Sequence, residues 1–351
     1  MSLRLPEVPP PDQGAAEAAR RRLDRLTKPP GSLGALEDIA ARLAGVQGRP
    51  LPAVERKLAL VVAADHGVAR QGVSAYPSEV TGQMVRNFLA GRAAVNVLAA
   101  QAGARVMVVD AGMLEPTYDR RVLDLRLGAG TADLSRGPAM SRGQAEEGLA
   151  RGAALGRAGL DADAVACGEM GIGNTTAASA IAAALLRRPA VEVTGRGTGV
   201  DDAAFRHKVA VIDAALAALA PDPDDPVDVL AKVGGFEIAV LAGAMVGCAA
   251  ARRAVVVDGL ISAAAALVAA RLAPAVRPYL FASHLSVEPG HALILDDLGL
   301  APVLDLRMRL GEGTGAVVAL TVLEAACRVL AGMATFEEAG VAGPVPREGA
   351  T

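Results

Sequence analysis

Aromatic residues are scarce in this sequence of 351 residues, which contains no tryptophan, three tyrosines and five phenylalanines. A flat ligand would therefore contact mostly aliphatic and methionine side chains. An excess of positive charge is also missing, because the formal net charge is −3. Nucleic acid binds to strongly basic surfaces, so a nucleic-acid partner is not expected.

Cysteine is rare, and Cys167, Cys248 and Cys327 lie far apart in apolar surroundings without a CxxC pair. This spacing predicts reduced core residues of a cytoplasmic protein rather than disulfides. Residues 1–14 lack the apolar core of a signal peptide, which also favours the cytoplasm.

Two apolar stretches of the sequence are too short for a membrane span, and the histidines lack the ligand spacing of a metal site. The apolar stretches 238–250 and 254–270 are interrupted by charged residues and fall short of the roughly 20 residues that cross a bilayer, so no membrane partner is expected. His284 and His291 flank Glu288, but a Pro-Gly pair would break a helix between them. The spacing is not that of a zinc site, and no metal is predicted.

Short apolar runs rich in β-branched residues alternate with longer runs rich in alanine and leucine. This alternation predicts an α/β fold, a Rossmann-like parallel sheet covered by helices on both faces. Ligands of such sheets bind beyond the carboxyl ends of the strands. The expected strands are 58–65, 104–112, 163–169, 253–259 and 278–284, and the polar residues at their ends are Asp65, His66, Asp110, Glu169, Asp258, Ser283 and His284.

The two ends of the chain contain no predicted strand. Residues 13–26 and 34–46 are expected to form helices separated by a Pro-Pro-Gly segment, and the part after Glu312 is also expected to be helical. We therefore expect a small helical domain beside the sheet. Its N-terminal part would be residues 1–56, the large α/β substrate-binding domain 57–311, and the C-terminal helices that pack with the N-terminal ones 312–351.

The most informative motif is GEMGIGNTT, residues 168–176, which follows an apolar strand and precedes an apolar helix. The first N–H groups of a helix lack partners and carry the positive end of its dipole, so such a turn suits a phosphate. Gly171 and Gly173 permit close backbone approach, and Asn174 or a threonine can cap the helix. A tight turn without any ligand explains the same residues.

Two further glycine-rich clusters occupy residues 195–208 and 309–316. The second repeats the pattern of 168–176, with a glutamate among glycines, then a threonine and an apolar helix. A loop meant only for anions would not contain a carboxylate, so a heterocycle N–H or a hydroxyl is expected nearby. Glu169 and Glu312 are candidates for proton transfer if folding brings them to one cleft.

Eight segments together carry a resemblance to one family. In order they are LTKPPGSLGALEDIAARLAG, ADHGVARQGVSAYPSEVTGQMV, GEMGIGNTT, GRGTGVDD, KVGGFEIAVLAGAM, VVDGLIS, SHLSVEPGH and RLGEGTGA. Their order and spacing resemble the nicotinate-nucleotide:5,6-dimethylbenzimidazole phosphoribosyltransferases over nearly the whole chain. The resemblance implies a homodimeric enzyme that needs no cofactor. It would convert nicotinate mononucleotide and 5,6-dimethylbenzimidazole into nicotinate and α-ribazole 5′-phosphate, which enters the nucleotide loop of cobalamin.

The same resemblance implies roles for individual residues. The glutamate of GEGTGA, Glu312, would be the general base, with Glu169 as a second catalytic candidate. Asp258 is a further polar candidate for substrate binding, whose simpler role is to cap a helix. The phosphate would be held by Gly171, Ile172, Gly173, Asn174, Thr175 and Lys208.

The slot for the incoming base is implied along SAYPSEVTGQM. Members of the family often have a smaller or different residue where Tyr76 stands. The preferred base is therefore not determined by the resemblance, and it could be dimethylbenzimidazole, another benzimidazole, a purine or a phenol. The residues implied to line the slot are Tyr76, Gln83, Met84, Ser286, Leu310 and Gly311.

Two other classes of protein also fit an anion-binding turn. One is a different nucleotide or phosphosugar transferase or hydrolase, and the other is a non-enzymatic nucleotide-binding or sensor protein. A hydrolase would release nicotinate without forming a riboside, and a sensor would bind without turnover.

Overall fold

The computed structural model describes residues 3–197, 199 and 201–343. The chain divides into two compact units. The larger unit consists of Met1–Pro10 and Glu55–Thr321, and the smaller of Pro11–Val54 and Val322–Thr351. All candidate site residues named above belong to the larger unit.

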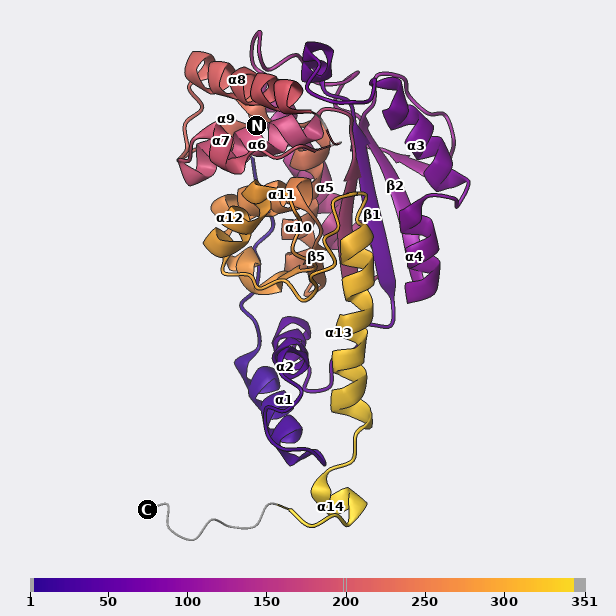
Figure 1. Ribbon diagram of the computed structural model, residues 1–351. Helices are drawn as coiled ribbons and strands as arrows, with labels where there is room; N and C mark the ends of the chain where they lie inside the picture. Colours follow the sequence, from indigo (N-terminus) through magenta and orange to yellow (C-terminus); the bar gives the residue numbers. More distant parts are fainter. Residues whose placement is uncertain (1–2, 198, 200, 344–351) are drawn as a thin grey trace. The chain divides into compact units, whose positions relative to one another are not determined.

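A parallel six-stranded sheet forms the centre of the larger unit (Figure 1). Its strand order is β3-β2-β1-β4-β5-β6, so the direction of the chain across the sheet reverses between β1 and β4. Ligands of open α/β sheets bind at such a switch point. The strands are β1 (Lys57–Ala64), β2 (Ala104–Gly112), β3 (Val122–Asp124), β4 (Ala164–Met170), β5 (Ala254–Val257) and β6 (Leu280–Ala282).

Helices cover both faces of this sheet, which confirms the predicted fold class. Figure 1 shows α3 and α4 on one side and α5 and α10 on the other. The α-helices of the larger unit are α3 (Glu79–Leu89), α4 (Ala94–Ala102), α5 (Arg142–Ala154), α6 (Asn174–Leu186), α7 (Ala190–Val193), α8 (Asp202–Leu219), α9 (Pro226–Val233), α10 (Phe236–Ala250), α11 (Leu260–Leu272) and α12 (Pro289–Leu298). Shorter helical turns are η1 (Gly67–Gln71), η2 (Leu155–Gly159) and η3 (Pro274–Tyr279).

Helices α5 and α10 pack with their backbones in direct contact, because glycines recur every four residues on the facing sides. A Cβ atom on Gly152 would lie 2.0 Å from the carbonyl oxygen of Val240. A Cβ atom on Gly243 would lie 2.1 Å from the carbonyl oxygen of Leu149. Helix α10 is almost wholly buried, as expected for a helix that is apolar all round.

The smaller unit joins helices from both ends of the chain. It contains α1 (Gln13–Arg25), α2 (Ala35–Gln47), the C-terminal part of α13 (Thr314–Gly332) and α14 (Phe336–Ala339). The side chain of Asp12 caps α1, and Nε of Arg22 donates to the carbonyl oxygen of Leu330 over 2.8 Å.

The boundaries of the units differ from the expected ones at two places. Residues up to Pro10 belong to the larger unit, where the Tyr279 hydroxyl donates to the carbonyl oxygen of Pro9. The first turns of α13 also belong there, because Asp258 accepts hydrogen bonds from Gly313 and Ala316.

Within the described part of the chain, α13 alone has the length and apolar composition of a membrane span. Half of its most apolar window is buried inside the protein, as in a core helix. The two stretches considered from the sequence overlap the shorter helices α10 and α11. The cytoplasmic location and the lack of a membrane partner stay predictions.

Candidate active site

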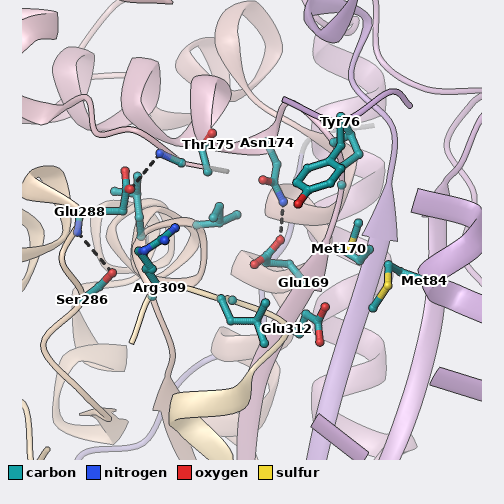
Figure 2. Close-up of a pocket in the computed structure, with 18 of the residues that line it drawn as sticks. Tyr76, Met84, Glu169, Met170, Asn174, Thr175, Ser286, Glu288, Arg309 and Glu312 are labelled. Atoms are coloured by element: carbon teal, nitrogen blue, oxygen red, sulfur yellow. Dashed lines mark hydrogen bonds between the residues drawn. The ribbon is translucent and has the colours of Figure 1, made fainter. Parts of the chain in front are cut away.

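A cavity of about 740 Å³ opens beyond the carboxyl end of β4 (Figure 2). Its wall is formed by the β4–α6 turn, the start of α3, the start of α11, the segment after β6 and the segment before α13. The lining residues are Tyr76, Val80, Met84, Glu169, Met170, Gly171, Ile172, Asn174, Thr175, Gly197, Gly259, Leu260, Ile261, His284, Ser286, Glu288, Arg309, Leu310, Gly311 and Glu312.

The cavity has a polar side and an apolar side. Figure 2 shows Thr175, Ser286, Glu288 and Arg309 on one side, and Tyr76 with two methionines on the other. The carboxyl groups of Glu169 and Glu312 lie between the two sides (Figure 2). A ligand with a charged part and a flat apolar part therefore matches this wall.

The β4–α6 turn forms part of the polar side. Gly173 has a φ of 97° and precedes α6, a left-handed conformation that glycine adopts without strain. The N–H of Ile172 donates to Oγ1 of Thr81 over 3.1 Å, so this N–H is already engaged by the protein. Gly173 faces His66 and Ala69, behind the cavity wall.

Lys208 lies behind the polar side, on α8, and is fully buried. Its Nζ donates to Oγ1 of Thr175 over 2.8 Å. Burial lowers the pKa of Lys208 to about 8, although the charge of Glu288 acts in the opposite direction. Lys208 therefore places a positive charge directly behind a hydroxyl that faces the cavity.

Glu288 reaches the polar side from the segment before α12. Its Oε1 accepts the N–H of Gly197 over 2.9 Å, which holds Gly197 at the cavity wall. From the sequence, we considered Glu288 only as a possible metal ligand. Within the described residues, no group of three or more His, Cys, Asp or Glu side chains has the arrangement of a metal site.

Glu169 links the β4–α6 turn to the segment before α13. Its carboxyl group accepts a short hydrogen bond from Nδ2 of Asn174 and another from the backbone N–H of Glu312. Burial, followed by the charges of Glu237 and Asp258, raises the pKa of Glu169 to about 8 against the effect of those two hydrogen bonds. Glu169 is therefore mostly protonated near neutral pH.

Glu312 has a different environment. It has a φ of 61° between two glycines with φ values of 83° and 82°, a left-handed conformation that is uncommon for a residue with a Cβ atom. Its Oε2 is buried and has no hydrogen-bond partner among the described residues. Burial, followed by the charge of Asp258, raises the pKa of Glu312 to about 7.

Asp258 holds the segment that contains Glu312. Its Oδ2 accepts the N–H of Gly313 over 3.1 Å, and its Oδ1 accepts the N–H of Ala316 over 2.8 Å. Both oxygens are thereby committed to the first turn of α13, and the side chain is buried beneath the cavity. Asp258 thus holds the start of α13, and its role in substrate binding stays a prediction.

Most residues predicted for the site come together at the cavity. Those that line it are Glu169, Glu312, Gly171, Ile172, Asn174, Thr175, Tyr76, Met84, Ser286, Leu310 and Gly311. Gly173, Lys208 and Asp258 lie behind its wall, and Gln83 is exposed on α3.

Several lining residues were not predicted. Met170 and Arg309 stand inside motifs that were recognised, next to residues that were chosen. Val80 lies one helical turn before Met84, so the helical period was the signal that could have found it. The remaining unpredicted residues are Gly197, Gly259, Leu260, Ile261 and Glu288, whereas His284 is one of the polar residues expected at the strand ends.

Known proteins match almost the entire chain. A sequence profile of a phosphoribosyltransferase family matches residues 8–341. The nicotinate-nucleotide–dimethylbenzimidazole phosphoribosyltransferase of Chloroflexus aurantiacus is 56% identical over 340 residues, 95% of this chain and 96% of its own. The enzyme of the same name from Geobacter metallireducens is 52% identical over 341 residues, 96% of each chain.

Solved structures agree with these matches. The crystal structure of CobT from Thermus thermophilus superposes with a TM-score of 0.90 at 48% identity, covering 94% of this chain and 99% of that one. The chain thus belongs to the nicotinate-nucleotide–dimethylbenzimidazole phosphoribosyltransferase family.

Proposed function

We propose that this protein transfers the 5-phosphoribosyl group of nicotinate mononucleotide to 5,6-dimethylbenzimidazole. The products are nicotinate and α-ribazole 5′-phosphate, which enters cobalamin biosynthesis. Relatives named for this transfer match the chain along nearly all of its length. The observation that carries the proposal is Glu312, a buried carboxylate with an unpartnered oxygen, within the described structure, at the wall of a cavity that is polar on one side and apolar on the other.

The reaction replaces one C–N bond by another at C1′ of the ribose. A ring nitrogen of the benzimidazole donates its lone pair to C1′ from the face opposite nicotinate, which gives the α-riboside. The bond from C1′ to the pyridinium nitrogen breaks, and its electron pair returns to the ring that leaves as nicotinate. The new riboside is cationic until its remaining N–H proton is removed. Glu312 accepts this proton and becomes a neutral carboxyl group.

Two observations favour Glu312 over Glu169 as the base. Glu169 already accepts hydrogen bonds from Asn174 and from the backbone of Glu312, whereas Oε2 of Glu312 is free to accept one among the described residues. The pKa of Glu169 is also the higher of the two, at about 8 against about 7. Near neutral pH, Glu312 is therefore the glutamate with the larger charged fraction, and a base must be charged to accept a proton.

We assign the polar side of the cavity to the phosphoribosyl group. The turn 171–174, Thr175 and Lys208 would hold the phosphate, because a helix N-terminus and a buried ammonium group both favour an anion. Alignment of the two reactants lowers the barrier by several kcal/mol, and a positioned base adds about 10²–10⁴ in rate.

The apolar side suits the incoming base. Val80, Met84 and Met170 offer a flat heterocycle contacts without polar groups, and Tyr76 is 54% exposed at this wall. Leu310 and Gly311 lead to Glu312, so a ring placed here would have its N–H close to the proposed base. We propose that these residues select a benzimidazole.

Product analysis tests this function. The protein is incubated with nicotinate mononucleotide and dimethylbenzimidazole, and the mixture is separated by chromatography and mass spectrometry. We expect nicotinate and α-ribazole 5′-phosphate in equal amounts. Nicotinate without a riboside would indicate a hydrolase, and binding without any product would indicate a sensor.

We also propose that the protein is a homodimer. Support comes from large apolar side chains that stay exposed in the single chain, among them Tyr76, Leu306 and Leu310. Groups of exposed apolar residues often mark protein contacts. Analytical ultracentrifugation at micromolar concentration should show a dimer, and a fully active monomer would overturn this assignment.

A further inference from the structure

A buried ion pair lies directly behind the β4–α6 turn. Nε2 of His66, just after β1, is 2.8 Å from Oε1 of Glu237, in the first turn of α10. The two side chains are 1% and 0% exposed. Neither residue lines the cavity, so the reaction as proposed does not use either one directly.

The ring of His66 supports the glycines of that turn. A Cβ atom on Gly171 would lie 3.4 Å from Cδ2 and Nε2 of His66, and one on Gly173 would lie 3.3 Å from its Cβ. Gly235, just before α10, would place a Cβ atom 2.5 Å from Cε1 of the same ring. His66 is therefore packed among three glycines, and it lies beside the point where the turn comes closest to β1, since a Cβ atom on Gly171 would lie 2.4 Å from the carbonyl oxygen of Ala64.

A second contact joins the same two segments. The N–H of Ile172 donates to Oγ1 of Thr81, and the Thr81 hydroxyl is hydrogen-bonded to the carboxylate of Asp65. The adjacent residues Asp65 and His66 thus support the turn from one strand end, the first through Thr81 and the second through direct packing.

The surroundings of His66 favour a positive charge on its ring. Burial opposes the charge, but Glu237 and Asp65, the charged groups that face the ring, together raise the pKa of His66 above its ordinary value. Glu237 also contributes to the raised pKa of Glu169, so its charge acts on both sides of the turn.

We propose that His66, held by Glu237, is a positioning residue for the substrate phosphate. The pair keeps the turn 171–174 in its anion-binding shape and adds a positive charge beneath it. This inference rests on the proposed function only in taking a phosphate ester as the ligand of the turn. It assigns no chemistry at C1′ to either residue.

Two variants separate shape from charge. Glu237→Gln keeps the size of the side chain and a hydrogen bond to His66 but removes the charge that stabilises the imidazolium. His66→Gln keeps a donor toward Glu237 but removes the ring and its charge. Arg56→Gln is the matched control, because it breaks the 2.7 Å ion pair with Asp163 beside the N-terminal ends of β1 and β4, whereas the turn follows the carboxyl end of β4.

Ribose 5-phosphate and nicotinate mononucleotide are the probes, with binding measured by calorimetry. We expect Glu237→Gln and His66→Gln to weaken binding of both probes about tenfold, as is typical of a lost charged interaction. KM for nicotinate mononucleotide should rise by the same factor while KM for dimethylbenzimidazole changes less than about twofold, because the base binds on the other side of the cavity. Arg56→Gln should leave all of these values near those of the native protein.

The charge itself is visible by NMR, because the chain has only four histidines. In ¹⁵N-histidine-labelled protein, we expect the His66 ring to lose its proton at a higher pH in the native chain than in Glu237→Gln, because the charge of Glu237 raises the pKa of His66. If Glu237→Gln does not fold, as judged by circular dichroism, His66→Gln carries the binding test. Native affinity for ribose 5-phosphate in a folded variant would overturn the inference. Weakened phosphate binding without any riboside formation in the native protein would instead refute the proposed function and leave this inference standing.

Discussion

The turns that carry Glu169 and Glu312 share a sequence pattern but differ in how their carboxyl groups are bonded. Both place a glutamate among glycines before an apolar helix that begins with a polar residue. In the first, Glu169 accepts hydrogen bonds from Asn174 and from the backbone of Glu312. In the second, Oε2 of Glu312 is buried without a partner in the described structure, while Asp258 binds the backbone that follows it.

This difference gives the two glutamates different tasks. A carboxyl group that is fully hydrogen-bonded fixes the geometry of its neighbours, and Glu169 joins the two turns. A buried carboxylate without a partner is costly for the folded protein. Such a carboxylate at the wall of a cavity has a function if the N–H of a bound substrate supplies the missing hydrogen bond. This is the role proposed for Glu312.

The largest effect is expected from Glu312→Gln. The amide keeps the shape and polarity of the side chain but cannot accept a proton. We expect kcat to fall by at least about 10², the lower end of what a general base contributes, while KM for both substrates changes little. Steady-state kinetics of the purified variant measures this. A decrease of only a few-fold would assign the base role elsewhere.

The next largest effect is expected from Lys208→Ala, which tests the polar side of the cavity. Loss of a buried charged contact should weaken binding of nicotinate mononucleotide by about 2 kcal/mol. Dimethylbenzimidazole should bind as before. Isothermal titration of each ligand separates the two effects, and an unchanged affinity for the nucleotide would remove Lys208 from the phosphate site.

A smaller effect is expected from Glu169→Gln. The amide oxygen can still accept one of the two hydrogen bonds that now join the turns, so the geometry is weakened rather than lost. We expect kcat to fall about tenfold or less, since removal of one hydrogen bond to a buried group costs about 1–2 kcal/mol. A loss as large as that of Glu312→Gln would show that the two glutamates act as one unit in catalysis.

The smallest effect on the maximal rate is expected from Asp258→Asn. The amide still accepts one N–H of the α13 turn, so kcat at its plateau should fall only a few-fold. Removing the negative charge should lower the pKa of Glu312, because Asp258 is one of the two causes that raise it. The acidic limb of the rate profile should therefore move to lower pH. A shift toward higher pH would contradict the charge effect.

Local patterns predicted most of the fold. Five of the strands and helices α1 and α2 follow from apolar periodicity and breaker residues. β3 was missed because it has only three residues, two of which are exposed, and so leaves no pattern. The strand order depends on pairing between distant segments, and periodicity contains no information about such pairing.

The site was predictable where one motif contains several of its residues. Gly171, Asn174 and Glu312 were found through their glycine-rich turns. Glu288 was missed because its neighbours at the cavity come from distant segments. Gln83 was misplaced because Val80 and Met84, one helical turn apart, occupy the face of α3 that lines the cavity.

The pH dependence of kcat/KM, which reports the ionisation of groups in the free enzyme, tests the central claim most directly when it is compared between the native protein, Glu312→Gln and Glu169→Gln. The pKa of Glu312 is raised to about 7, so its carboxylate forms as the pH rises through that value, and the native rate should rise with it. This limb should persist in Glu169→Gln and disappear in Glu312→Gln, whose residual rate should be flat between about pH 6 and 8. Retention of the limb in Glu312→Gln, together with its loss in Glu169→Gln, would contradict the assignment of Glu312 as the base.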